Sequence, residues 1–295
     1  MSLRRALLTA LPKKLLSRLT GGLTSIPLPT PLRAPLYRAF AKRYGVRLEE
    51  CGAALADYPS FRAFFTRSLK EGARRVEGGP MDLCSPVDGK IVSAGRIQEG
   101  RIPQVKGWSY EVTELLRGLP QAAQFARGSQ ATIYLAPGDY HRIHAPSSGS
   151  ITHFSHVPGT LFPVNPPALR AIPGLFVRNE RISLLIQDSP LGELALVAVG
   201  ALNVGSIHFS CLPQVRTNRG GKGSHGPLPK GPFPIQKGQD LGCFSFGSTV
   251  LLLSKDPELE WLDLGKNSRT LQGMLLARIK SVATKGTKDD TSGPE

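Results

Sequence analysis

Residues 85–92, SPVDGKIV, and residues 145–152, APSSGSIT, share one pattern that decides the fold class. In each stretch a proline is followed by a glycine, and the glycine by a short run that contains isoleucine and a β-branched neighbour. Proline and glycine favour turns, whereas β-branched residues favour strands. The pattern therefore predicts a turn followed by a strand, used twice in the chain.

Short β-forming runs separated by prolines and glycines continue from about residue 80 to residue 256. The turn sequence KGQDLG at 237–242, followed by a β-forming run at 244–253, fits the closure of the same unit. We therefore expect a β-rich, barrel-sandwich-like core. Residues 216–242 form a long segment rich in glycine, proline and basic residues, a composition and length typical of a functional or disordered loop.

The N-terminal region predicts amphipathic helices. Leucines recur there at helical spacing, with lysines and arginines on the other side: Leu8, Leu11, Leu15 and Leu19. The glycines at 21 and 22 are expected to end this helix, and the proline-rich residues 26–35 to form a stiff connector. Residues 36–48 predict a second basic helix. Periodicity alone leaves open whether the first helix lies in a membrane interface or packs on the body of the protein.

Two further helices are expected. The pattern of residues 60–70 has Ser60 as an N-cap and phenylalanines at helical spacing, so we assign these aromatic side chains to the core. Residues 268–279 predict a C-terminal helix, followed by a disordered polar tail. The fold class is thus α+β in three parts: a membrane-associating segment and connector (1–35), the main domain (36–264), and the C-terminal helix and tail (265–295).

The distribution of charged residues along the chain favours some classes of partner over others. The net charge is +15, yet residues 1–48 hold ten of the lysines and arginines and no acidic residue. This concentration in amphipathic segments favours an anionic membrane surface as a partner, with nucleic acid disfavoured because no basic strand carries interleaved aromatic residues. No apolar run reaches the roughly 18–20 residues of a membrane-spanning helix. The basic N-terminus is either an interfacial anchor or an organellar presequence.

Three turns of the predicted β core carry residues able to activate a nucleophile. Ser248 follows Gly247, His141 and His144 lie in one short loop, and Asp88 lies in the first turn-and-strand unit. A serine becomes a nucleophile when a histidine, held by a carboxylate, accepts its proton. A glycine before the serine leaves its carbonyl unhindered, so Ser248 can attack the carbonyl of its own chain.

Five short blocks, taken together, resemble phosphatidylserine decarboxylase proenzymes of the pyruvoyl-dependent, bacterial type. The blocks follow that family's order: SPVDG at 85–89, DYHRIH at 139–144, VPGTLFPVN at 157–165, NER at 179–181 and FGST at 246–249. The resemblance covers roughly residues 36–256. Two positions depart from the family pattern: Phe246 replaces a more frequent leucine, and Gly138 stands where arginine is frequent.

The resemblance implies that the chain cuts itself between Gly247 and Ser248. Asp88 would orient His144, His144 would take the proton of Ser248, and the Ser248 Oγ would attack the Gly247 carbonyl. The resulting ester would eliminate and hydrolyse to leave a pyruvoyl group at the new N-terminus. The products would be a β chain of residues 1–247 and an α chain of residues 248–295, held together as a heterodimer or a higher oligomer.

The same resemblance implies the reaction. The pyruvoyl group from Ser248 would form a Schiff base with phosphatidylserine and take up the electrons left when CO₂ departs, so no metal and no pyridoxal phosphate is expected. The product would be phosphatidylethanolamine. His141 would contact the substrate or donate a proton, and Phe162 and Asn165 would contact the substrate. The chain would be a peripheral membrane protein on the cytoplasmic face of the inner membrane.

Two alternatives belong to other classes. A zinc hydrolase using His141 and His144 would need a third ligand, and the sequence offers none nearby. A biotinyl or lipoyl carrier module would need a modifiable lysine in a Met-Lys-Met or Asp-Lys-Ala setting, and neither tripeptide occurs.

Overall fold

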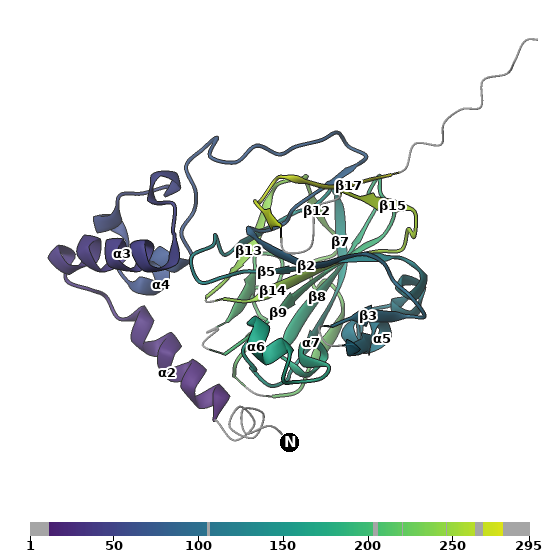
Figure 1. The fold of residues 1–295 in the computed structure, drawn as a ribbon, viewed down its shortest axis with the longest axis horizontal. Helices are drawn as coiled ribbons and strands as arrows, with labels where there is room; N and C mark the ends of the chain where they lie inside the picture. Colours follow the sequence, from purple (N-terminus) through teal and green to yellow (C-terminus); the bar gives the residue numbers. More distant parts are fainter. Residues whose placement is uncertain are drawn as a thin grey trace, which may run out of the picture.

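The computed structural model describes residues 12–104, 107–202, 206–219, 221–245, 247–262 and 268–279. Helices α2, α3 and α4 form a lobe at one side, and a strand-rich core makes up the rest of the molecule (Figure 1). The α+β class predicted from the sequence is confirmed. Leu8, Leu11, Phe246 and the predicted polar tail lie outside the described residues.

The N-terminal helices differ from the prediction at their boundaries. Helix α2 spans Lys13–Ser25 and runs through the two glycines that were expected to end it. The helix packs on the rest of the chain through its inner side, where Lys13 and Ser17 are buried, and a glycine inside a helix costs only about 1 kcal/mol. Helix α3 spans Thr30–Tyr44 and already includes most of the predicted proline-rich connector. Pro31 lies in the first turn of α3, where a missing N–H leaves no hydrogen bond unmade.

The aromatic stripe of residues 60–70 forms a core, as predicted, but the helix is shorter. Helix α4 spans Phe61–Phe65, and the Oγ of its N-cap Ser60 accepts a hydrogen bond from Ala63 N at 3.2 Å. Phe64 is fully buried and stacks on the ring of Tyr37 from α3, with the ring centroids 4.5 Å apart. Short 3₁₀ turns at Leu48–Glu50 and Leu55–Asp57 complete this lobe.

The main sheet contains nine antiparallel strands of the described chain, in the order β11-β7-β8-β9-β14-β5-β2-β16, with β12 also paired to β7. Their bounds are β2 (Gly89–Arg96), β5 (Ser129–Tyr134), β7 (Gly149–Val157), β8 (Arg181–Gln187), β9 (Leu194–Val199), β11 (Ser224–Pro227), β12 (Phe233–Ile235), β14 (Thr249–Ser254) and β16 (Arg269–Thr270). Strands β2 and β7 start at the glycines of the two predicted turn-and-strand units, which confirms both. Strands β11 and β12 lie inside the long basic segment.

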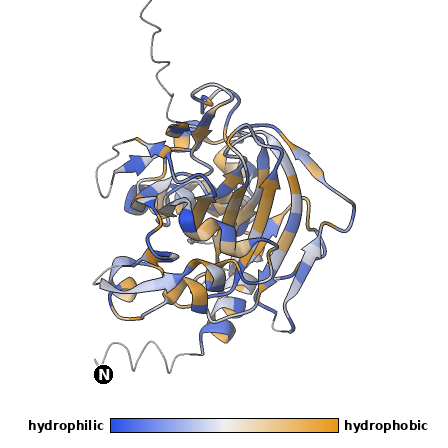
Figure 2. Ribbon diagram, turned by 90° about the vertical axis from the view of Figure 1, so that its right-hand side faces the viewer, coloured by the Kyte–Doolittle hydropathy of each residue, from blue (hydrophilic) through white to orange (hydrophobic). Residues whose placement is uncertain are grey.

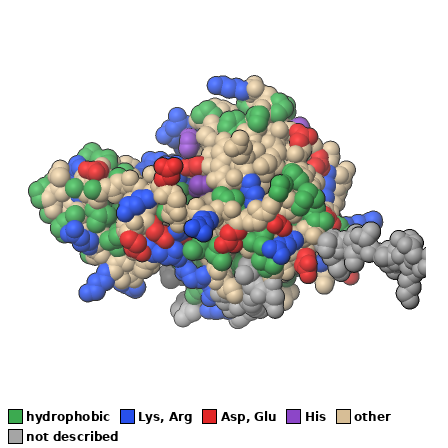
Figure 3. All heavy atoms as spheres, turned by 90° about the horizontal axis from the view of Figure 1, so that it is seen from above, with side chains coloured by type: hydrophobic (Ala, Val, Ile, Leu, Met, Phe, Trp, Pro, Cys, Tyr) green, Lys and Arg blue, Asp and Glu red, His purple; other side chains and the backbone are tan. Residues whose placement is uncertain are grey.

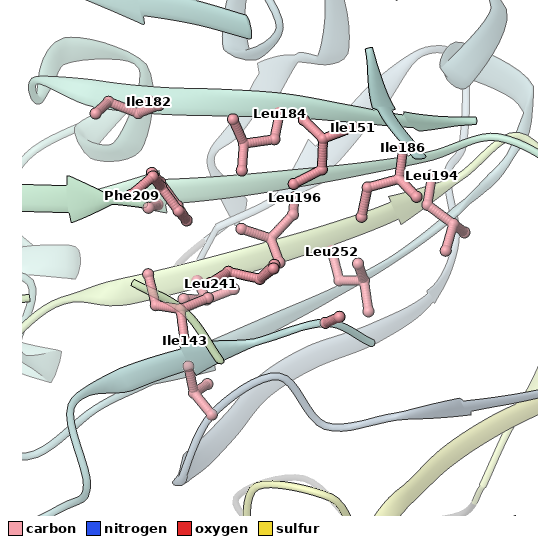
Figure 4. Close-up of a cluster of buried hydrophobic side chains, with 14 of the residues drawn as sticks. Ile143, Ile151, Ile182, Leu184, Ile186, Leu194, Leu196, Phe209, Leu241 and Leu252 are labelled. Atoms are coloured by element: carbon pink, nitrogen blue, oxygen red, sulfur yellow. The ribbon is translucent and has the colours of Figure 1, made fainter. Parts of the chain in front are cut away.

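Both faces of this sheet are covered at its centre, where β8, β9 and β14 are almost entirely buried. One face packs against a second sheet of β10 (Ile207–Phe209), β13 (Asp240–Phe244) and β6 (Arg142–His144), so that Leu241 and Ile143 meet Leu196 and Leu252 (Figure 4). The other face is covered by α5 (Val112–Leu115), α6 (Pro166–Leu169) and α7 (Leu175–Arg178). Apolar residues accordingly concentrate on the central strands (Figure 2). The described strands form a sandwich-like core and no closed barrel.

The predicted C-terminal helix at 268–279 is wrong. These residues form β16 and β17 (Leu275–Ile279), and β17 pairs with β1 (Asp82–Cys84) and β15 (Leu259–Trp261). Gly273, with a φ of +87°, makes a turn that interrupts any helix, and the apolar run after it buries Leu276 and Ala277 against the core. A small hairpin of β3 (Arg101–Pro103) and β4 (Ser109–Glu111) and a 3₁₀ segment at Ala122–Arg127 complete the described elements.

Candidate active site

The Gly247–Ser248 peptide lies at the start of β14, the strand between β5 and β9. Ser248 is fully buried, and its carbonyl accepts a hydrogen bond from Leu135 N at 2.9 Å, just beyond the end of β5. Its Oγ has no hydrogen-bond partner among the described residues. The structure therefore fixes the backbone of the serine and leaves its nucleophilic oxygen uncommitted.

His141 is the predicted site residue that lies closest to this peptide. A Cβ built on Gly247 would lie 3.9 Å from His141 Nε2. The Nδ1–H of His141 donates to the Asp139 carbonyl at 2.8 Å, so Nε2 carries the lone pair, and it has no partner among the described residues. Burial lowers the pKa of His141 to about 3. His141 thus presents a neutral nitrogen, able to accept a hydrogen bond, toward the Gly247–Ser248 peptide.

His144 has both ring nitrogens hydrogen-bonded. Its Nδ1–H donates to the Gly238 carbonyl at 2.7 Å, and its Nε2 accepts from the Tyr140 hydroxyl at 3.0 Å. Burial lowers the pKa of His144, so the neutral ring predominates near neutral pH. The Gly238 carbonyl therefore fixes the tautomer in which Nε2 is the acceptor, the form that a general base requires.

Asp88 is buried and held by two other partners. Its Oδ2 accepts from Arg74 Nη2 at 2.9 Å, and its Oδ1 accepts from Gln272 N at 2.7 Å. Arg74 also pairs with Glu50 at 2.6 Å, which links the helical lobe to the turn of Asp88. The backbone N–H of His144 donates to Pro86 O at 2.8 Å, so His144 lies beside this turn.

The structure therefore groups the predicted residues in two sets. His141 lies with Gly247 and Ser248, whereas His144 lies beside the turn of Asp88 through its backbone. No hydrogen bond among the described residues joins the side chains of Asp88, His144 and Ser248. The triad remains a prediction. It would require His144 Nε2 to give up its hydrogen bond from the Tyr140 hydroxyl and to accept one from Ser248 instead.

Phe162 and Asn165 have structural roles in the described chain. Phe162 is buried in the core, with the cation of Arg178 4.9 Å from its ring centroid. Asn165 caps α6, because its Oδ1 accepts from Ala168 N at 3.1 Å. Their predicted contact with substrate stays a prediction.

Sequence reasoning missed four groups that hold the site: Arg74, Asp139, Tyr140 and the Gly238 carbonyl. Asp139 is buried, accepts from Ala136 N at 2.7 Å and pairs with Arg269, and burial raises its pKa. Asp139 and Tyr140 belong to the DYHRIH block, so their place beside His141 and His144 in the sequence could have marked them as site residues. Arg74 and Gly238 act through contacts that only the folded chain creates.

Gly138, one of the two departures from the family pattern, has a steric reason in this chain. A Cβ at position 138 would overlap the carbonyl of Tyr44 at the end of α3. The close approach of helix and loop excludes a side chain there. A larger residue at position 138, such as the arginine of the family pattern, is therefore incompatible with the way α3 packs here.

Among the described residues there is neither a candidate membrane-spanning helix nor a candidate metal cluster. No helix in the described ranges is long and apolar enough to cross a membrane. Within those same residues, no cluster of three or more histidine, cysteine, aspartate or glutamate side chains could hold a metal ion.

Comparisons with known proteins agree on one family. The phosphatidylserine decarboxylase family profile matches residues 61–278, more than half of the chain. The chain is 45% identical over 247 residues to a protein of Anaeromyxobacter sp. (strain K), covering 83% of this chain and 87% of that protein. It is 41% identical over 257 residues to a protein of Myxococcus xanthus (strain DK1622), covering 87% and 91%.

A protein of Brevibacillus brevis (strain 47 / JCM 6285 / NBRC 100599) is 38% identical over 278 residues, covering 93% of this chain and 97% of that protein. All three relatives are named phosphatidylserine decarboxylase proenzyme. The chain belongs to the phosphatidylserine decarboxylase family.

Proposed function

We propose that this chain is a proenzyme that cleaves itself between Gly247 and Ser248 and then decarboxylates phosphatidylserine to phosphatidylethanolamine. The observation that carries the proposal is that two buried atoms without a hydrogen-bond partner among the described residues, Ser248 Oγ and His141 Nε2, both lie at the Gly247–Ser248 peptide. Family membership over residues 61–278 supports the same reaction.

Self-cleavage needs a base for the Ser248 hydroxyl. We assign this role to His144, because the Gly238 carbonyl holds its Nε2 as the acceptor and its backbone lies beside the turn of Asp88. Rotation of the Tyr140 hydroxyl would release that nitrogen for the Ser248 proton. As the Oγ attacks the Gly247 carbonyl, the peptide C–N bond breaks and its nitrogen takes up the proton. Loss of the Ser248 Cα proton then expels the Gly247 carboxylate and leaves dehydroalanine at position 248. One water hydrolyses this residue to a pyruvoyl group and releases ammonia.

The residues at the site fit a pyruvoyl group in place of Ser248. When formed, that group supplies a ketone able to take up the electron pair left by CO₂. The position is fully buried, which excludes water from a reactive carbonyl. The backbone of residue 248 stays held by Leu135 N, so the new chain end keeps its place.

His141 would act on the substrate as a neutral group. Its pKa of about 3 means that it carries no proton on Nε2 near pH 7. A neutral imidazole accepts a hydrogen bond from the substrate amine, and can move a proton only after first receiving one. Of the two predicted roles, substrate contact therefore fits its electrostatics better than proton donation.

Access to a lipid substrate would come through α2. Leu15, Leu19 and Leu23 are 55%, 62% and 70% exposed, whereas Lys13 and Ser17 on the inner side are buried. Lys and Arg side chains lie among hydrophobic ones over the helical lobe (Figure 3). The helix thus packs by its polar side and presents leucines outward, an arrangement suited to an anionic bilayer surface. We propose a peripheral membrane location on that basis.

The activity is tested with purified protein and phosphatidylserine in detergent micelles. We expect the wild-type protein to release CO₂ and form phosphatidylethanolamine, and Ser248→Ala to do neither. Equal CO₂ release by both proteins would overturn the proposal, since the reaction would not depend on Ser248.

A further inference from the structure

We infer that a basic cavity between α2 and residues 213–219 binds the phosphodiester of the lipid substrate. The cavity measures about 810 Å³, and its walls include Ser206 and Ser245 as well as four arginines: Arg18, Arg62, Arg216 and Arg219. None of its lining residues is an aspartate or glutamate. The inference rests on the proposed function and names the groups that recognise its substrate.

The four guanidinium groups lack a counter-charge in the described chain. None of them forms an ion pair with a described residue. Arg62 reaches only the hydroxyls of Ser25 and Ser206, at 3.5 Å each, and Arg18 donates to the Asn218 carbonyl at 2.9 Å. Like charges around one hollow repel each other, and a phosphodiester is an anion whose oxygens match the arginine fork.

The loop that carries Arg216 and Arg219 is anchored to the core through buried hydrogen bonds of Asn218. Asn218 has a φ of 58°, and its N–H donates to Glu180 Oε2 at 2.8 Å. Glu180 in turn accepts from His156 Nε2 at 2.9 Å, and all three residues are buried. Because the Asn218 carbonyl also accepts from Arg18, the same residue joins the core to α2. The backbone from which the arginines on either side of Asn218 extend is thus fixed at Asn218.

A buried polar atom also points to an occupant. Asn218 is 4% exposed and lines the cavity, yet its side-chain oxygen has no hydrogen-bond partner among the described residues. A buried amide without a partner is costly. Because this oxygen accepts hydrogen bonds, a ligand would satisfy it with a donor, such as a hydroxyl or ammonium group of the lipid headgroup, and not with the phosphodiester itself.

The position of the cavity selects a lipid as that ligand. Ser245 in its wall is three residues before Ser248 in the chain, so the cavity reaches the segment that leads into the cleavage site. The opposite wall is α2, whose outer side exposes Leu15, Leu19 and Leu23. A glycerophospholipid combines an anionic phosphodiester with chains that can follow these leucines. A phosphopeptide or nucleic acid has no such apolar part.

The first test separates binding from pyruvoyl chemistry by using the uncleaved Ser248→Ala protein. Titration calorimetry with glycerophosphoserine, glycerophosphoglycerol and inorganic phosphate measures the affinity of the cavity. We expect both glycerophosphodiesters to bind. Arg216→Gln/Arg219→Gln in the same background should lower their affinity about 10-fold or more, since each lost contact would be a charge-assisted hydrogen bond. Arg127→Gln/Arg170→Gln, which removes two exposed arginines outside the cavity, is the control with the same charge change.

The second test uses the Ser248-containing protein. Arg216→Gln/Arg219→Gln should still yield two chains, and its apparent KM for phosphatidylserine in mixed micelles should rise by a similar factor, with a smaller change in kcat. Equal loss in the control pair would show a general charge effect and overturn the inference. Binding of phosphate alone, or of no probe, would also overturn it. Probe binding by an inactive protein would instead overturn the proposed chemistry and leave the cavity's role intact.

Discussion

At the scale of single residues, the site depends on groups that hold the predicted catalytic side chains. Asp88 is fixed by Arg74 and by a backbone N–H from beyond the cleavage site, and His144 by the Gly238 carbonyl. The motif residues themselves were recognisable from sequence because they stand in short blocks. Their partners come from positions 14 to 184 residues away, so no local pattern could reveal them.

Arg74 is expected to be a positioning residue for self-cleavage. Arg74→Gln would leave the buried carboxylate of Asp88 without its cation, and removing one partner of a buried pair costs about 3–5 kcal/mol. We expect slower conversion to two chains, followed over time on denaturing gels. Arg47→Gln, which removes the more exposed partner of Glu50, is the control. Cleavage of Arg74→Gln at the wild-type rate would exclude the role.

The buried His141 should make stability depend on pH. Its pKa falls from 6.5 to about 3 on folding, so the unfolded chain binds more protons below pH 6.5. The contribution of neutral His141 to the free energy of unfolding is complete above pH 6.5. It is lost progressively as the pH falls toward 3, by up to about 1.4 kcal/mol per pH unit.

The measurement is urea unfolding of the uncleaved Ser248→Ala protein at pH 7.5 and pH 5.5. Adding His141→Asn should reduce the loss of stability between these two values, whereas adding His153→Asn, on β7, should not. An identical pH dependence with and without His141 would contradict the assignment.

At the scale of elements, patterning predicted strands better than helix ends. The glycines that start β2 and β7 were read correctly because turn chemistry is local. The run LLARI at 275–279 fits a helix or a strand equally well, and its pairing with β1 decided the outcome. Helix α2 continues through two glycines because the packing of its inner side outweighs glycine's modest penalty.

Two glycines allow this explanation of α2 to be tested. A Cβ would meet nothing within 4 Å at Gly22, inside α2, or at Gly45, which caps α3 with a φ of +73°. Gly22→Ala should stabilise its helix by about 0.5–1 kcal/mol, whereas Gly45→Ala should destabilise the chain because the left-handed conformation disfavours a side chain. Hydrogen exchange of the α2 amides should slow in Gly22→Ala. Faster exchange there would contradict the assigned helix.

At the scale of the whole molecule, the segment after Ser248 is built into the fold of the segment before it. Strand β14 lies between β5 and β9, β16 pairs with β2, and β17 pairs with β1. The α+β class followed from composition and pattern, but this strand order did not, because it depends on pairings between distant segments.

The interwoven strands predict that the two chains stay together after cleavage. Size-exclusion chromatography without denaturant should elute both chains in one peak, and guanidinium chloride should separate them. Separation in native buffer would contradict the strand order, since pulling out β14 would expose the centre of the core. An uncleaved Ser248→Ala sample provides the matched reference for elution volume.

The central claim, that Ser248 is converted by self-cleavage, is tested most directly by the intact mass of the purified protein under denaturing conditions. The account predicts chains of residues 1–247 and 248–295, the smaller lighter than a serine-started peptide by the mass of one ammonia, and a single full-length chain for Ser248→Ala. A single full-length mass for the wild-type protein, or cleavage of Ser248→Ala at the same bond, would contradict it.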